Sequence, residues 1–130
     1  MENNPTFNLY VDSGMLYEIY LGLANLVEDA QTGQTTKTPI DLSDIVSLSG
    51  DIKKNYSSSA SLVASFNVSI ENATAGEILV TLPASASANI ELGPDPTYLW
   101  GYYDIVATNN LGTKIKIVGG KVYLNQVLNK

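Results

Sequence analysis

Hydrophobic and polar residues alternate with a period of two along most of the chain, and this period predicts β-strands with one buried face. The clearest example covers residues 64–71 and is followed, after residues 72–76, by a second alternating segment at 78–82. The connection ends in Gly76, and glycine adopts positive φ at little cost. We therefore expect a hairpin whose inward side chains belong to the core: Phe66, Val68, Ile70, Ile78, Val80 and Leu82.

The same alternation predicts further strands at residues 15–22, 46–54, 98–108, 113–118 and 121–128. The strand at 15–22 is the first periodic one. In the next strand, one face is expected to carry Val46, Leu48, Gly50 and Ile52. Gly119 and Gly120 separate the last two segments, and they form either a tight turn or a bulge that bends one long strand.

Helix is scarce in this pattern, because no window of a dozen residues carries an apolar stripe at helical spacing. Residues 83–90 begin with Pro83, are rich in Ala and Ser, and predict a short helix or helical turn. Residues 31–38 and 55–61 have the composition of exposed loops. The fold class that follows is an all-β antiparallel sandwich of six to eight strands with at most one short helix, with an open or Greek-key barrel as the alternative.

Aromatic residues gather between positions 98 and 103. Strict alternation places Tyr98, Trp100 and Tyr102 on one strand face and puts Tyr103 on the other. One of the two faces belongs to the core. The opposite face is a candidate for packing on a partner protein or for stacking on a sugar ring, because Tyr and Trp are enriched at interfaces.

The composition removes most catalytic chemistry, since the chain contains no Cys, His or Arg. Disulfides, thiol nucleophiles, the Ser-His-Asp triad and imidazole or thiolate metal sites are therefore excluded. The closest approach to a calcium loop is the segment Asp41–Asp44, which we interpret as a turn that uses a carboxylate to bind backbone N–H groups. We expect no enzyme activity, no cofactor and no metal site.

The charge balance disfavours binding to nucleic acid, because 7 Lys against 13 Asp and Glu give a net charge of −6. No apolar run approaches the ~20 residues of a membrane span, and the N-terminus lacks the features of a secretory signal. We expect a product that remains inside the cell where it is made. Residues 1–8 are polar apart from Phe7 and contain Pro5, so they are expected to form an N-terminal arm, with residues 9–130 as one sandwich domain.

An ordered series of short motifs carries a resemblance to a known protein class. These motifs lie at residues 7–14, 39–43, 52–54, 66–70, 75–78, 103–105 and 118–122. The series resembles the small immunoglobulin-like β-sandwich structural proteins of tailed bacteriophages, marine and cyanobacterial phages especially, and in outline the amino-terminal sandwich domain of upper baseplate proteins. Such proteins usually carry Gly-x-Tyr before the Tyr-Asp strand, whereas this chain has the longer segment 93–101.

The resemblance implies a virion structural protein, either a capsid decoration or cement protein or a component of the neck, tail or baseplate. It would act by assembling with other virion proteins and with itself, without nucleic acid or membrane, after synthesis in the host cytoplasm. The interface is expected to use the arm residue Phe7 and one aromatic face with Tyr98, Trp100 and Tyr102. The alternative is a carbohydrate-binding or protein-binding immunoglobulin-like module of a phage or cell-surface adhesin.

Overall fold

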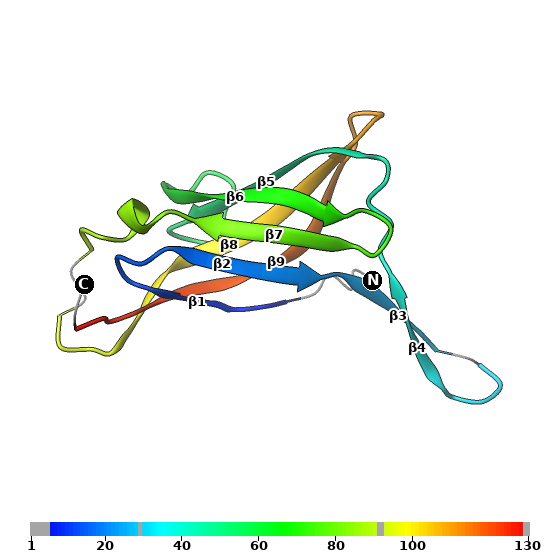
Figure 1. Ribbon diagram of the computed structural model, residues 1–130, viewed down its shortest axis with the longest axis horizontal. Coiled ribbons are helices and arrows are strands. Elements are labelled where there is room, and N and C mark those ends of the chain that lie inside the picture. Colours follow the sequence, from blue (N-terminus) through cyan, green and yellow to red (C-terminus); the bar gives the residue numbers. More distant parts are fainter. Residues whose placement is uncertain (1–5, 29, 91–92, 129–130) are drawn as a thin grey trace.

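The structure is a computed structural model that describes residues 6–28, 30–90 and 93–128, and strands dominate it (Figure 1). The strands of the described residues are β1 (Leu9–Asp12), β2 (Tyr17–Gly22), β3 (Ala24–Glu28), β4 (Thr35–Pro39), β5 (Ile45–Lys53), β6 (Leu62–Asn72), β7 (Glu77–Leu82), β8 (Thr97–Asn109) and β9 (Lys114–Asn125). The helix that these residues contain is one 3₁₀ turn, η1 (Ala84–Ala86). The predicted all-β class with at most one short helix is confirmed.

Seven strands form one sheet in the order β1-β9-β8-β5-β6-β7-β2, and this sheet curls until it is nearly closed. β6 pairs with β5 through its first half and with β7 through its second half, so it passes from one layer to the other. The layer β2-β7-β6 and the layer β5-β8-β9 reproduce the B-E-D and C-F-G order of the immunoglobulin sandwich. All neighbours pair antiparallel except β1 and β9, which run parallel.

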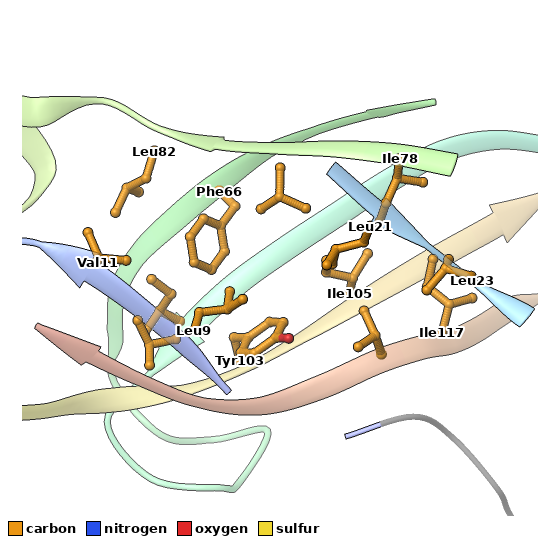
Figure 2. Packing of buried hydrophobic residues seen from close by; sticks show 14 of the residues in the cluster. Leu9, Val11, Leu21, Leu23, Phe66, Ile78, Leu82, Tyr103, Ile105 and Ile117 are labelled. Atoms are coloured by element: carbon orange, nitrogen blue, oxygen red, sulfur yellow. The ribbon is translucent and has the colours of Figure 1, made fainter. Parts of the chain in front are cut away.

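The core lies between the two layers and draws on all seven strands of this sheet (Figure 2). The predicted hairpin is present as β6 and β7, and Gly76 at its turn has φ of 69°. Phe66, Ile78, Val80 and Leu82 are buried as expected. Val68 and Ile70 are half-buried and pack against the core from its edge.

Three strands, β1, β3 and β4, lie where the sequence pattern indicated none. Residues 31–38 were expected to be a loop, yet Thr35–Pro39 is the strand β4 and pairs antiparallel with β3. The strand escaped detection because it carries no large apolar residue, while its threonines favour extended backbone by their β-branching. β1 precedes the strand that the pattern placed first, at residues 15–22. Only two of the four residues of β1 are buried, which is too short a pattern to recognise.

Local bulges account for the errors in the predicted strand faces. The pairing of β5 with β8 shifts register between Ile45 and Ser47, which leaves Val46 67% exposed rather than on the inner face. The extra residue of a bulge reverses the alternation on one side of it. A period-two pattern cannot show which residue is the extra one, so the sequence placed Val46 on the same face as Leu48 and Ile52.

Gly119 and Gly120 lie in the middle of one continuous strand, so the segments 113–118 and 121–128 are not separated by a turn. Both glycines are buried, and a Cβ added at Gly120 would lie 2.6 Å from the carbonyl oxygen of Phe7. The missing side chain lets the N-terminal segment approach β9 closely. The bulge in this region falls instead opposite the step from Ile105 to Val106 of β8.

The predicted arm, residues 1–8, is attached to the sandwich from Thr6 onward. Thr6 forms a parallel bridge with Gly119, and the Phe7 N–H donates to the Gly119 carbonyl at 2.9 Å. The Phe7 carbonyl accepts a hydrogen bond of 2.6 Å from the buried Tyr103 hydroxyl. Residues 1–5 lie outside the described residues. The part of the arm at Thr6 and Phe7 is thus bonded to the sandwich.

Deleting residues 2–5 should leave the stability unchanged, whereas deleting residues 2–8 should lower the free energy of unfolding by about 1–3 kcal/mol. The longer deletion removes the acceptor of a buried hydroxyl group, and an unpaired buried hydroxyl costs desolvation energy. Urea unfolding of the two truncated proteins measures the difference. Tyr103→Phe, combined with the longer deletion, should recover part of the loss, since the unpaired hydroxyl group is then absent. Equal stability of the two truncated proteins would contradict this account.

Two tyrosines, Tyr103 in the core and Tyr17 packed against it, make the fold sensitive to alkaline pH. Burial raises the pKa of Tyr17 to about 12. Burial also raises the pKa of Tyr103, and the neighbouring Tyr17 raises it further. An unfolded tyrosine ionises near pH 10, so above this pH the unfolded chain binds fewer protons than the folded one. The free energy of unfolding is therefore at its full value below pH 10, and it falls as the pH rises toward the pKa values of the folded protein.

The melting temperature should accordingly stay level up to about pH 9 and fall between about pH 10 and 12. Circular dichroism melts across this range measure it. Tyr17→Phe should make the decline shallower because one of the two shifted groups is removed. A wild-type melting temperature that does not change up to pH 12 would show that the two pKa values are not raised in the folded protein.

Candidate binding surfaces

A β-bulge separates the aromatic residues that the sequence placed on one face. The pairing of β8 with β9 shifts register between Leu99 and Gly101. Trp100 is only 6% exposed and lies in the core, and beyond the bulge the inward positions are Gly101, Tyr103 and Ile105. Tyr102 therefore points to the outer face. The prediction that Tyr98, Trp100 and Tyr102 share a face is wrong, and Trp100 is buried in the fold.

The bulge depends on glycine at position 101. A Cβ added there would lie 2.6 Å from the carbonyl oxygen of Lys53 and 2.9 Å from the Ile52 side chain. Such distances require the backbone of β5 or β8 to shift. The dipeptide Trp100-Gly101 is the signal in the sequence that marks this irregularity, because glycine inside a strand often accompanies a bulge.

The remaining predicted interface residues lie at the surface but at different places. Phe7 is 44% exposed beside Gly120, and Tyr98 is 41% exposed near the start of β8. Tyr102 is half-buried and stacks on Tyr56 with ring centroids 5.9 Å apart. Sequence reasoning missed Tyr56, because it belongs to a serine-rich loop that has no periodic pattern.

A second aromatic pair lies on the outer face of β1 and β9. Tyr10 and Tyr123 are cross-strand partners, and their rings stack with centroids 5.1 Å apart and planes at 10°. Leu99 pairs with Tyr123 from the other side. These side chains cover the seam where the N-terminal strand joins the sheet, so we interpret them as part of its attachment.

The loop of residues 54–61 folds back over the outer face of β5 and β8. The Lys53 ammonium group donates to the Ser58 carbonyl at 2.8 Å, and the Lys116 ammonium group donates to the Tyr56 hydroxyl. The same ammonium group lies 4.9 Å from the centre of the Tyr56 ring. These contacts and the stack on Tyr102 hold the loop above the sheet.

The space beside this loop is an open groove of about 720 Å³. Its floor consists of outward residues of β5 and β8, which form the cross-strand pairs Ser47–Thr108, Ser49–Val106 and Asp51–Asp104. The Ser65 hydroxyl donates to the Asp51 carboxylate at 2.8 Å. The lining thus combines hydroxyl groups, carboxylates, the ammonium groups of Lys53 and Lys114, and the ring of Tyr56.

The third surface feature is the hairpin of β3 and β4, which pair only with each other and project away from the sandwich (Figure 1). Its base is held firmly. The Leu23 N–H donates to the Gly76 carbonyl, and the Ile40 N–H donates to the Leu23 carbonyl, both at 2.9 Å. A Cβ at Gly76 would lie 2.6 Å from the carbonyl oxygens of both Leu23 and Ile40.

Among the described residues, no group of three or more His, Cys, Asp or Glu side chains has the arrangement of a metal site. Asp41 accepts hydrogen bonds from the backbone and the hydroxyl group of Ser43, which lower its pKa, so its carboxylate closes a local turn as expected. The helical part of the described chain is too short to cross a membrane. Neither a protein-family model nor a curated protein matches this chain.

Gly101→Ala should lower the free energy of unfolding by about 1–3 kcal/mol, because the added methyl group meets the backbone of β5. Gly22→Ala is the matched control, since a Cβ at Gly22 meets no atom within 4 Å. Chemical denaturation of both variants measures the two effects. A Gly101→Ala protein as stable as the Gly22→Ala protein would show that the bulge does not need glycine.

Proposed function

We propose that this chain is a non-catalytic structural protein that works by protein–protein assembly in the virion of a tailed bacteriophage. It serves there as a capsid decoration or as a component of the neck, tail or baseplate. Two lines of support converge on this proposal. The motif series at residues 7–122 resembles such proteins, and the surface carries an element suited to pairing with another chain.

The projecting β3–β4 hairpin is the observation that carries the proposal (Figure 1). A two-stranded hairpin is at best marginally stable in water by itself, and among the described residues β3 and β4 pair with no other strand, which leaves both outer edges open. Its base, in contrast, is fixed by the contacts of Leu23 and Ile40 with the β6–β7 turn. A rigid base with an open two-stranded extension can add strands to a neighbouring sheet without refolding the sandwich.

The charge and composition of the chain agree with this role. The net charge of −6 repels nucleic acid at long range and favours partners with a basic surface. The partners are other virion proteins, in the head or the tail, and a second copy of the chain. The sequence lacks Cys, His and Arg, so an enzyme mechanism would have to use carboxylates, Lys or Tyr alone, and binding rather than turnover is the proposed activity.

Immunoelectron microscopy locates the protein. An antibody against the chain should label purified phage particles at one structure, the head, the neck or the tail. Particles that carry no label, together with free chain in the lysate, would contradict the proposed role.

A shortened hairpin tests the mode of attachment. Because Asn25 pairs with Thr38, residues 26–37 can be replaced by Asn-Gly, which closes a two-residue hairpin turn. The variant should melt at the wild-type temperature, since Leu23, Ile40 and the base contacts remain. Its amount on purified particles, measured against the major capsid protein, should fall sharply. Full incorporation of the shortened chain would place the attachment elsewhere on the sandwich.

A further inference from the structure

The groove over β5 and β8 is a feature that assembly through the hairpin does not use. It lies on the outer face of the sheet and is bounded by the loop of residues 54–61. Its volume of about 720 Å³ falls in the usual range of small-molecule sites, ~300–1,000 Å³. The size therefore suits a compact ligand rather than a protein surface.

The floor of the groove contains two carboxylates that are direct cross-strand partners, Asp51 and Asp104. Like charges that face each other across a sheet destabilise it. Asp51 accepts a hydrogen bond from Ser65 of β6, and its remaining lone pairs and the Asp104 carboxylate line the groove. A polar pair that weakens the fold at the base of a hollow is typical of a binding surface, where ligand hydrogen bonds offset the cost.

The mixture of groups around the two carboxylates defines the ligand class. Asp51 and Asp104 accept hydrogen bonds, whereas Lys53, Lys114 and the serine hydroxyls donate them. The carboxylates disfavour an anion such as a phosphate, and the two ammonium groups disfavour a cation. A neutral molecule with many hydroxyl groups satisfies donors and acceptors together.

An aromatic wall completes the site. Tyr56 is 62% exposed and belongs to the lining, and its ring is held against Tyr102 by stacking. The hydrogen bond from Lys116 to the Tyr56 hydroxyl fixes the other end of the side chain. A rigid ring beside hydrogen-bonding groups can pack against the C–H face of a sugar while the carboxylates bind its hydroxyl groups.

We propose that the groove between the loop of residues 54–61 and the outer face of β5 and β8 binds a short neutral saccharide. Asp51 and Asp104 bind its hydroxyl groups, and Tyr56 packs against a sugar ring. This inference is independent of the proposed virion role, because the hairpin takes no part in the groove. The protein with the shortened hairpin should therefore bind the same saccharides as the full chain.

Titration of the full isotope-labelled chain with neutral trisaccharides of glucose, mannose and N-acetylglucosamine tests the proposal by NMR. At least one of them should shift the amide signals of the groove, those of Asp51, Tyr56 and Asp104 among them. Sodium phosphate and spermidine are titrated in parallel. No shift with any of the three saccharides, shifts outside the groove, or shifts with phosphate or spermidine alone would overturn the proposal.

Substitutions then assign the roles of the groove residues. Tyr56→Ala and Asp104→Ser should each weaken saccharide binding about tenfold or more, because each removes a direct contact. Tyr123→Ala is the matched control, since Tyr123 is a tyrosine of the same sheet face that stacks on Tyr10 and does not line the groove. Asp104→Ser should also raise the melting temperature, which shows that the variant is folded. Unchanged binding by Tyr56→Ala and Asp104→Ser would overturn the proposal.

Discussion

The hydrogen bond from the Tyr103 hydroxyl to the Phe7 carbonyl is the contact on which the closure of the sandwich depends. Tyr103 is buried in the middle of β8, so its hydroxyl group needs an acceptor inside the fold. The acceptor comes from a segment 96 residues away, and it reaches Tyr103 only because Gly120 has no side chain in its path. Once Phe7 is held there, the chain continues directly into β1, whose parallel pairing with β9 supplies Leu9 and Val11 to the core.

How far the sequence predicts this fold depends on the kind of residue at each position. Ile78, Val80 and Leu82 repeat with a strict period of two, and their burial followed directly from it. Val46 and Trp100 also belong to alternating segments, but a single extra residue beside each of them changes the face. Whether a bulge forms is decided by neighbouring strands, through contacts such as that between Gly101 and the Lys53 carbonyl. A pattern within one strand contains no information about that neighbour.

The candidate sites were harder to predict than the core for a related reason. Tyr102 was singled out as aromatic, yet its partner Tyr56 lies 46 positions earlier in a loop of serines, and only the fold brings the two rings together. Asp51 and Asp104 are likewise unremarkable in the sequence and become cross-strand neighbours through the pairing of β5 with β8. The hairpin formed by β3 and β4 escaped notice because its backbone pairing does not require an apolar face.

The two features for which we propose functions, the groove and the projecting hairpin, are ones that the fold does not need. The sandwich closes through Tyr103, Gly120 and β1, and neither the groove nor the projecting hairpin contributes to that closure. The acidic pair places like charges opposite each other across the sheet, and the hairpin exposes backbone groups that a shorter connection between Leu23 and Ile40 would not. Selection for stability alone would remove both features. The interior therefore determines the fold, and the outer face and the extension are the places where we propose that the protein makes its contacts.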